Sequence, residues 1–300
     1  MFNITKYYKF WFSVSLVLFV AGVVSLSLYG LRLGIDFKGG TLTQVNFQNG
    51  VPALDDIHQV AVDAGITTAQ VQPAGTQSAI IRTEPIEKDQ HDKMLQALRD
   101  KFGTVTEEEY TSIGPLIGKE LRSQAFIQLT LVSLGIILYI AYAFRKVTKP
   151  VSSWRFGWAA IVALIHDLVI VIGAFSILGH FWGIEVDSLF VTAVLTVLGF
   201  SVHDTIVVFD RIRENLRQRT GQSLAEIINN SINQTLVRSI NTSLTVIFVL
   251  AALLLFGGET IRWFVAALLI GIAAGTYSSI FIASPLLLVW YNWDLRRKSK

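Results

Sequence analysis

Six long apolar runs limit the folds that this chain can adopt. They cover approximately residues 10–30, 126–144, 156–178, 188–209, 239–256 and 262–290, and Pro285 interrupts the last run. A helix crosses the hydrocarbon core of a bilayer with about 20 apolar residues, so each run is long enough to span a membrane. With 52% hydrophobic and only 16% charged residues, the composition also favours a membrane protein over a soluble one. The sequence therefore predicts an α-helical membrane protein with six spans.

The stretch between the first two runs is polar and long enough for one small folded domain. Strand-like alternation and amphipathic helix patterns follow one another along it. The predicted elements are strand 41–48, helix 52–65, strands 67–73 and 78–84, helix 87–103 and strand 104–113. This is the βαββαβ order of a ferredoxin-like α+β domain, with the last strand at an edge. His58 and His91 fall on polar helix faces, so both are predicted to be surface residues.

Lysine and arginine lie mostly on one side of the predicted spans. That side carries Lys6, Lys9, Arg145, Lys146, Lys149, Arg155, Arg211, Arg213, Arg217, Arg219, Arg238, Arg296, Arg297, Lys298 and Lys300. The short loops on the other side, residues 179–187 and 257–262, contribute only Arg262. The positive-inside rule therefore predicts that both termini are cytoplasmic and that the folded domain lies outside the cytoplasm.

The predicted organisation has four parts. They are a cytoplasmic N-terminus with the first span at 1–30, an extracytoplasmic domain at 31–125, a five-helix bundle at 126–295 with a cytoplasmic amphipathic segment at 211–237, and a basic cytoplasmic tail at 296–300. The net charge of +3 is explained by the cytoplasmic loops, so no nucleic-acid partner is predicted. The chain has no cysteine, which excludes disulfides, thiolate metal sites and cysteine nucleophiles.

Ionisable residues inside the predicted spans are the first candidates for function, because burying charge in a membrane is costly. His166 and Asp167 lie in the third span, and His203 and Asp204 lie in the fourth. Neighbouring residues on a helix diverge by about 100°, and metal-binding HExxH spacing is absent, so no metal site is predicted. Two interpretations remain: hydrogen bonding between helices, or a proton or ion relay.

Helical spacing places a set of small and polar residues on one face of the fourth span. The set comprises Thr192, Thr196, Gly199, His203 and Asp210, with Ser201 and Asp204 along its border. A stripe of small residues on the third span comprises Ala159, Ala163, His166 and Gly173. Small residues allow close helix packing, so these faces are predicted to meet each other or a partner inside a bundle. Arg238, at the start of the fifth span, is a candidate cation for Asp204 or simply a positive-inside arginine.

Several motifs together resemble the SecF family, the smaller partner of SecD in bacterial protein export. They are "GIDFKGG" at 34–40, "IGPLIGKELRSQA" at 113–125, "ALIHD" at 163–167, "GFSVHDTIVVFDRIRE" at 199–214 and "RSINTSLT" at 238–245. The one-plus-five arrangement of spans is also similar to SecF, and the five-span block is similar to half of a resistance-nodulation-division transporter. The resemblance covers nearly the whole chain.

The resemblance implies a role without enzyme activity or cofactor. With SecD, the protein would use the proton-motive force to help pull unfolded polypeptide through the SecYEG channel of the bacterial cytoplasmic (inner) membrane. YajC and YidC are further implied partners, together with membrane lipids. The ion-moving residues implied by the family are Asp204 and Arg238, while His203 stands where many relatives have Asn. Protonation of Asp204 would weaken its attraction to Arg238 and let the bundle shift.

The "GIDFKGG" stretch is expected to join the first span to the outer domain. Gly39 and Gly40 permit backbone angles that other residues resist, which is consistent with a hinge. Asp36, Phe37 and Lys38 complete this family motif, and Asp36 and Lys38 are expected to lock the turn or to contact SecD. Two other functions remain open: a subunit of a small-molecule or lipid exporter, and a passive scaffold for neighbouring membrane proteins.

Overall fold

The computed structural model of the chain describes residues 2–145, 153–218 and 221–298. Four of the basic residues used above to orient the spans, Lys146, Lys149, Arg219 and Lys300, lie outside the described residues. The chain divides into two compact units. A helical unit comprises Met1–Arg32, Gln128–Ile184 and Leu189–Lys300, and a sheet unit comprises Leu33–Ile127 and Glu185–Ser188.

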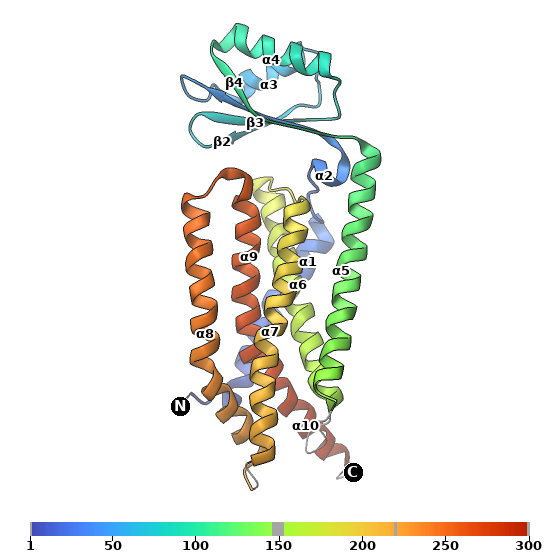
Figure 1. Cartoon of the computed structure of the whole chain (residues 1–300), viewed down its shortest axis with the longest axis vertical. Helices are drawn as coiled ribbons and strands as arrows, with labels where there is room; N and C mark the ends of the chain where they lie inside the picture. The colour runs from blue at the N-terminus through green and yellow to red at the C-terminus, as the bar shows by residue number, and fades with distance from the viewer. Residues whose placement is uncertain (1, 146–152, 219–220, 299–300) are drawn as a thin grey trace. The chain divides into compact units, whose positions relative to one another are not determined.

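The helical unit is built from long apolar helices (Figure 1). A short 3-10 turn at Thr5–Tyr7 precedes α1 (Tyr8–Tyr29), and the later helices are α5 (Pro115–Ala143), α6 (Ser153–Trp182), α7 (Ser188–Gln218), α8 (Leu224–Phe256), α9 (Glu259–Ser278) and α10 (Ser284–Lys298). The first part of α5, up to Ile127, and the first residue of α7 belong to the sheet unit. Six stretches of the described chain are long and apolar enough to cross a membrane, and the last joins α9 to α10. The predicted number of spans is confirmed.

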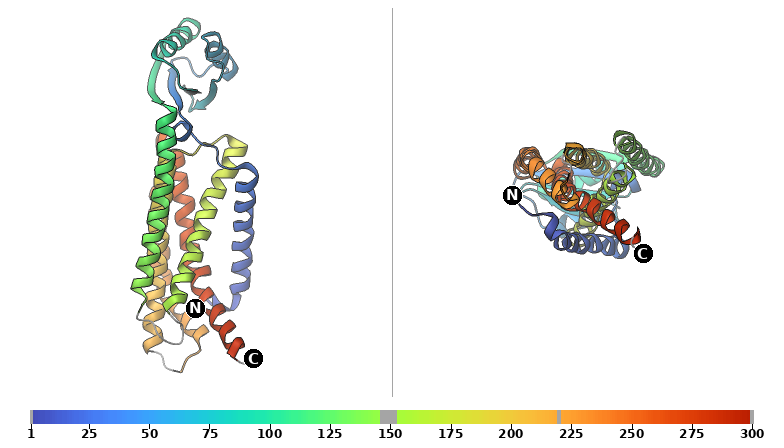
Figure 2. Two further views of the ribbon diagram at one scale, coloured as in Figure 1. Left: turned by 90° about the vertical axis from the view of Figure 1, so that its right-hand side faces the viewer. Right: turned by 90° about the horizontal axis from the view of Figure 1, so that it is seen from below.

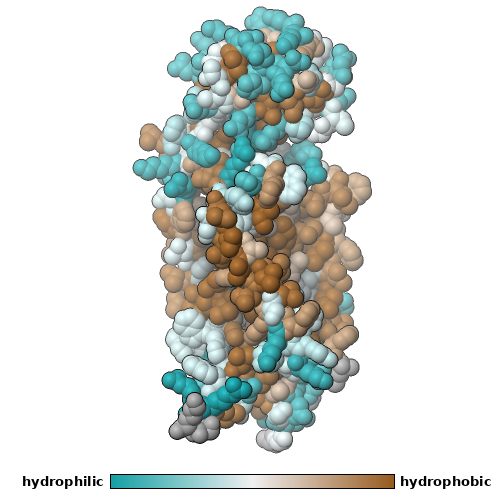
Figure 3. Space-filling view, turned by 180° about the vertical axis from the view of Figure 1, so that it is seen from behind, coloured by the Kyte–Doolittle hydropathy of each residue, from teal (hydrophilic) through white to brown (hydrophobic). Residues whose placement is uncertain are grey.

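The surface of the helical unit is apolar over its middle. On the face that Figure 3 shows, hydrophobic side chains form a broad field there, whereas the sheet unit is mostly hydrophilic. Large apolar residues such as Leu138, Phe248 and Leu255 are more than half exposed. Such a surface would be unfavourable in water but suits contact with lipid chains. The protein is a multi-pass membrane protein.

Small residues let the helices approach closely. Helix α1 runs along α6, as both views in Figure 2 indicate, and a Cβ atom added to Gly173 would lie 2.4 Å from the Cα of Gly22. Ala159, Ala163, His166 and Gly173 are all buried, so the predicted interior stripe on α6 is confirmed. On α9, Gly271 and Gly275 pack against α7.

The outward face of α7 differs from the prediction. Thr192, Thr196, Gly199, His203 and Asp210 are exposed, while the border residues Ser201 and Asp204 are buried. The bulky apolar residues of α7, including Val197, Leu198, Val208 and Phe209, fill the interior instead. Within this chain, the prediction of a buried small and polar face on α7 was therefore wrong. The other predicted possibility, that a partner protein covers this face of α7, remains.

The segment at 211–237 is not a separate helix. Its first part continues α7 to Gln218, and its second part belongs to α8, which begins at Leu224. Ser223 caps α8: its Oγ accepts a hydrogen bond from the Glu226 backbone N–H, and the Glu226 carboxylate accepts one from the Ser223 N–H. This capping box satisfies backbone donors that a helix start leaves unpaired. The predicted amphipathic segment therefore contains the end of α7 and the start of α8.

The last span is interrupted near Pro285, as predicted. A π-helical turn at Ser279–Ala283 separates α9 from α10. Proline has no N–H to donate to the carbonyl of the preceding turn, so a regular helix cannot pass through it. The Ser284 hydroxyl donates instead to the Ser279 carbonyl, five residues earlier, at 3.0 Å.

The sheet unit contains a four-stranded antiparallel sheet. Its elements are α2 (Ile35–Lys38), β1 (Gly40–Phe47), α3 (Leu54–Asp63), β2 (Gln70–Ala74), β3 (Ser78–Thr83), α4 (Lys88–Phe102) and β4 (Val105–Ile113). The strand order is β2-β3-β1-β4, and α3 and α4 cover one face of the sheet (Figure 1). Ile57, Ile81, Met94 and Leu98 are fully buried between these layers. The βαββαβ order and the edge position of the last strand are confirmed.

His91 is not a surface residue. It is only 5% exposed, its ring packs on Tyr110 of β4, and its Nε2 lies 3.3 Å from a carboxylate oxygen of Glu107. The helical pattern placed His91 on a polar face of α4, but β4 covers that position with a tyrosine and a glutamate. The surface prediction was therefore wrong for His91, whereas His58 is exposed as predicted.

Candidate functional site

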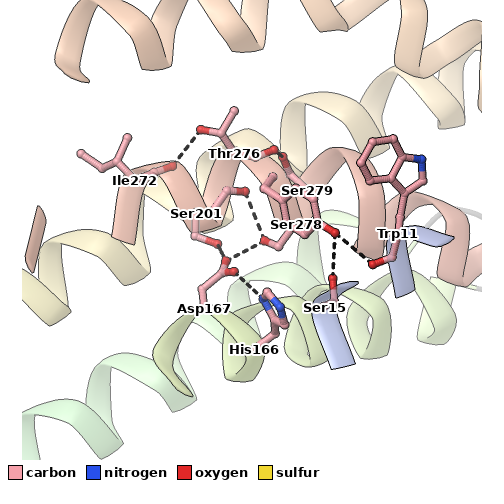
Figure 4. Close-up of polar contacts among 11 residues, drawn as sticks. Trp11, Ser15, His166, Asp167, Ser201, Ile272, Thr276, Ser278 and Ser279 are labelled. Atoms are coloured by element: carbon pink, nitrogen blue, oxygen red, sulfur yellow. Dashed lines mark hydrogen bonds and ion pairs between the residues drawn. The ribbon is translucent and has the colours of Figure 1, made fainter. Parts of the chain in front are cut away.

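Asp167 is the most deeply buried acidic residue of the helical unit, with no exposed surface. Its Oδ2 accepts hydrogen bonds from the Ser201 hydroxyl of α7 at 2.5 Å and from the Ser278 hydroxyl of α9 at 2.7 Å. Its Oδ1 lies 3.0 Å from Nδ1 of His166. Dashed lines in Figure 4 mark the contacts of Asp167 with these three residues. Three helices therefore meet at one carboxylate.

Asp204 is the second buried carboxylate, 7% exposed. Its Oδ2 accepts a short hydrogen bond from the Ser279 hydroxyl. Ser279 opens the π-helical turn, and its neighbour Ser278, at the end of α9, is bonded to Asp167. Two consecutive serines thus hold two different carboxylates, one on α6 and one on α7. Ser201, one turn before Asp204 on α7, connects the same two helices.

His166 has one partner and one free nitrogen. Its Nδ1 faces Asp167, and its Nε2 is buried without a hydrogen-bond partner among the described residues. A neutral imidazole that donates from Nδ1 leaves a lone pair on Nε2, and this lone pair can accept a proton. The ring stacks on Phe19 of α1, with centroids 6.4 Å apart. In that tautomer, His166 is a proton acceptor beside a buried carboxylate.

A second polar chain lies next to His166. The Tyr277 ring is 6.4 Å from the His166 ring, and the Tyr277 hydroxyl donates to the Trp11 carbonyl at 2.9 Å. The same hydroxyl accepts a hydrogen bond from Ser15 of α1 at 3.1 Å. Figure 4 shows Ser15 and Trp11 to one side of His166 and Asp167. The Tyr277 hydroxyl therefore joins α9 to α1, with its ring beside that of His166.

The five predicted relay residues are only partly brought together. Ser278 binds Asp167, which also contacts His166, and the next residue, Ser279, binds Asp204. His203 and Arg238 are exposed instead. Within the described residues, the Arg238 guanidinium makes no ion pair with Asp204, whose bound partner is Ser279. The structure thus presents a carboxylate–serine network rather than an Asp204–Arg238 pair.

Sequence reasoning missed Ser278 and Ser279 and placed Ser201 only at the border of a face. A usable signal is present in "GTYSS" at 275–279, a cluster of small and hydroxyl residues inside an apolar run and shortly before a proline. Over the described part of the chain, no three His, Asp or Glu residues come close enough to hold a metal ion. The chemistry available here is the transfer of protons among carboxylate, imidazole and hydroxyl groups.

The "GIDFKGG" stretch forms a tightly packed joint inside the sheet unit. Phe37 is buried, and Lys38 is exposed. Gly39 has φ +81°, and a Cβ atom there would lie 3.0 Å from the Pro115 backbone at the start of α5. Gly40 has φ +146°, and a Cβ atom there would lie 2.7 Å from the Thr83 carbonyl oxygen. Such close packing favours a rigid joint over a flexible hinge.

Replacing Gly40 by alanine is expected to destabilise the sheet unit by about 1 to 3 kcal/mol more than replacing Gly65 by alanine. Both glycines have positive φ, but nothing lies within 4 Å of a Cβ atom at Gly65, so the difference reports the clash with Thr83 and Ile35. Hydrogen exchange of the sheet-unit amides in the purified full chain measures it. Equal protection in the two variants would contradict the packing argument.

Comparison with known proteins identifies the family. Residues 93–293 match the family model described as protein export membrane protein SecD/SecF, C-terminal, and residues 24–51 match the SecD/SecF GG motif. The chain belongs to the SecD/SecF family. The SecD/SecF matches include both buried carboxylates in the first region and the whole "GIDFKGG" joint in the second.

SecD/SecF relatives of similar length are protein translocase subunits. The chain is 48% identical to protein translocase subunit SecF of Thermobaculum terrenum, covering 99% of this chain and 96% of that one. Identity is 43% with SecF of Anaerolinea thermophila, again over 99% and 96% of the two chains. The crystal structure of SecDF from Thermus thermophilus, a translocon-associated membrane protein, superposes with a TM-score of 0.85 at 33% identity. The match covers 97% of this chain and 39% of SecDF, whose single chain is longer. This chain is therefore a transport component rather than a known type of enzyme.

Proposed function

We propose that this chain is the SecF subunit of a SecDF complex and uses the proton-motive force to assist protein translocation through SecYEG. The observation that carries the proposal is the pair of buried carboxylates, Asp167 and Asp204, held by the consecutive serines of an interrupted helix. Membership of the SecD/SecF family supports protein export as the process that the proton-motive force drives.

The chemistry favours protons as the coupling ions. A carboxylate buried in a membrane is costly when charged, and taking up a proton removes that charge. The hydroxyls of Ser201 and Ser278 bind Asp167 directly, at 2.5 and 2.7 Å. A hydroxyl can accept one proton while donating another, so Ser278 is suited to exchange a proton with Asp167, and Ser279 with Asp204.

A change of partner at Asp204 would convert protonation into movement. In this structure Asp204 is bonded to Ser279 and Arg238 is exposed. We propose that charged Asp204 attracts Arg238 in another state of the cycle and that protonation releases it. One charge that crosses a potential of 100 mV supplies about 2.3 kcal/mol, so a large movement requires several protons.

The exposed face of α7 is suited to SecD. Thr192, Thr196, Gly199 and His203 place polar and small groups on the outside of a membrane-spanning helix. Polar groups in a span normally face a bundle interior, and small residues allow close helix contact. We propose that SecD covers this face in a heterodimer.

The arrangement in the cell follows from the same family role. The proposal places the chain in the bacterial cytoplasmic (inner) membrane with both termini in the cytoplasm and the sheet unit outside, as the distribution of lysine and arginine supports. The proposed parts remain 1–30, 31–125, 126–295 and 296–300. SecYEG, YajC and YidC are the further partners, with unfolded polypeptide as the substrate.

Vesicles that hold SecYEG, SecD and this chain are expected to complete translocation of a preprotein faster when a proton gradient is imposed. An ionophore that removes the gradient should remove the acceleration, and vesicles without this chain should show none. Acceleration that persists with the ionophore would contradict proton coupling. Normal secretion combined with drug sensitivity in a deletion strain would instead favour an exporter subunit.

A further inference from the structure

The segment that leads into α7 is fixed to the "GIDFKGG" joint. Residues 185–188, here called the strap, belong to the sheet unit although they lie between two helices of the helical unit in sequence. Val186 of the strap forms a parallel bridge with Leu33, and its carbonyl accepts a hydrogen bond from the Gly34 N–H at 2.8 Å. The strap is thus paired as a short extended segment beside the family motif.

Asp36 holds the last residue of the strap. Its Oδ2 accepts a hydrogen bond from the backbone N–H of Ser188 at 2.8 Å, and Ser188 is the first residue of α7. The first N–H groups of a helix have no partner within the helix, and the helix dipole favours a negative charge there. A carboxylate is therefore well suited to hold the start of α7, although it lies 152 residues away in sequence.

Arg82 on β3 provides a second anchor for the strap. Its guanidinium lies 3.3 Å from the carboxylate of Glu185, and both side chains are largely shielded from solvent, at 19% and 14% exposure. Arg82 also donates to Gln72 of β2 at 2.6 Å, which fixes its position on the sheet. The strap is therefore joined both to the motif and to the sheet itself.

The helix that Asp36 holds also carries the proton-binding carboxylate. Ser188 and Asp204 lie on one continuous helix, α7, about 24 Å apart along its axis at about 1.5 Å per residue. A rigid helix transmits an axial displacement along its whole length. Any movement of α7 that follows protonation of Asp204 would therefore reach Ser188.

We infer that Asp36 is a positioning residue that couples α7 to the sheet unit, so that movement of α7 produces movement of that unit. The inference rests on the proposed function for the source of the movement. This coupling role differs from a hinge role for the motif. In a coupling role, the hydrogen bonds and ion pair between the strap and the rest of the sheet unit must stay intact during the cycle. Asp36 is not part of the proton path in this scheme.

Replacing Asp36 by alanine should uncouple proton movement from translocation. In vesicles with SecD and SecYEG, proton flux should remain near that of the wild type, while gradient-driven stimulation should fall by about tenfold, the scale of losing one charged helix cap. Asp36→Asn keeps an oxygen that can accept from Ser188 and should retain most of the stimulation. Asp55→Ala is a matched control, because Asp55 also lies in the first turn of a helix but is exposed and makes no capping bond.

A cysteine pair tests whether the strap stays closed. The chain has no cysteine, so Leu33→Cys and Val186→Cys introduce only this pair, and bridged residues on adjacent extended segments are close enough for a disulfide. The crosslinked protein should keep its stimulation, and the crosslink should restore stimulation to the Asp36→Ala variant. Loss of stimulation on crosslinking would show that the strap must open, and would overturn the inference.

The remaining outcomes separate this inference from the proposed function. Normal stimulation in Asp36→Ala, or equal loss of flux and stimulation, would overturn the coupling role. Absence of flux in the wild type would instead overturn the proposed function. Hydrogen exchange at the start of α7 measures the coupling contact independently of flux: it should rise in Asp36→Ala and not in Asp55→Ala, and unchanged exchange would overturn the inference.

Discussion

Vesicles that hold the Asp204→Asn variant with SecD and SecYEG are expected to show no gradient-driven stimulation of translocation. Asparagine keeps the size of the side chain and an oxygen that can accept the Ser279 hydrogen bond, but it cannot take up a proton. Each proton lost from the cycle removes about 2.3 kcal/mol at 100 mV, equivalent to about a fifty-fold bias in an equilibrium. Translocation rates with and without an imposed gradient measure the effect, together with proton flux.

The matched control for this variant is Asp210→Asn. Asp210 lies on the same helix, but it is exposed and paired with Arg213 at 2.5 Å, one turn further along. This change should leave stimulation close to the wild-type level, since exposed pairs of this kind contribute little. Copurification with SecD should be unchanged in both variants. Undiminished stimulation in Asp204→Asn would remove Asp204 from the proposed mechanism.

Replacing Asp167 by alanine is expected to destabilise the helical unit by about 3 kcal/mol, because removing one member of a buried polar cluster leaves the others unpaired. The groups that lose their acceptor are His166, Ser201 and Ser278. Ser278 can turn to the Gly275 carbonyl, 3.2 Å away, which limits the cost. Thermal unfolding in detergent measures the loss of stability.

Two further variants separate stability from proton transfer at Asp167. Asp167→Asn keeps an acceptor and should unfold close to the wild-type temperature, yet it should reduce proton flux in vesicles. Ser243→Ala removes a hydrogen bond to Thr276 elsewhere in the bundle and should cost only about 0.6 kcal/mol, the average for such bonds in membranes. If the Asp167→Asn variant shows wild-type proton flux, Asp167 has only a structural role.

The parts of the fold that depend on local pattern could be predicted from the sequence. Apolar length located the six spans, and Pro285 located the interruption of the last one. Alternation and helix boundaries gave the order of elements in the sheet unit. Residues near one another in the chain determine these features, so the hydrophobic and turn patterns of the sequence indicate them.

The parts that depend on distant residues could not be predicted. The burial of His91 depends on Tyr110 of the neighbouring strand, which no helical pattern reveals. In the sequence, Ser278 and Ser279 resemble hydroxyl residues that bond only to their own helix. Their carboxylate acceptors lie on α6 and α7, far away in the chain, so no local pattern reveals them. The contact of Asp36 with Ser188 joins residues that are 152 positions apart, so no local pattern indicates it. Predicting the carboxylates was possible, whereas "GTYSS" indicates a polar cluster without indicating which carboxylates it holds.

Two segments that are separate in the sequence form the sheet unit, and this affects experiments on isolated fragments. A soluble fragment of residues 33–127 would lack Val186 and Glu185, so the Gly34 N–H and the Arg82 guanidinium would lose partners that they have in the full chain. The fragment would be an incomplete domain, and its measured stability would understate that of the intact unit. Exchange of this domain between relatives would likewise require both segments, 33–127 and 185–188, to be transplanted together.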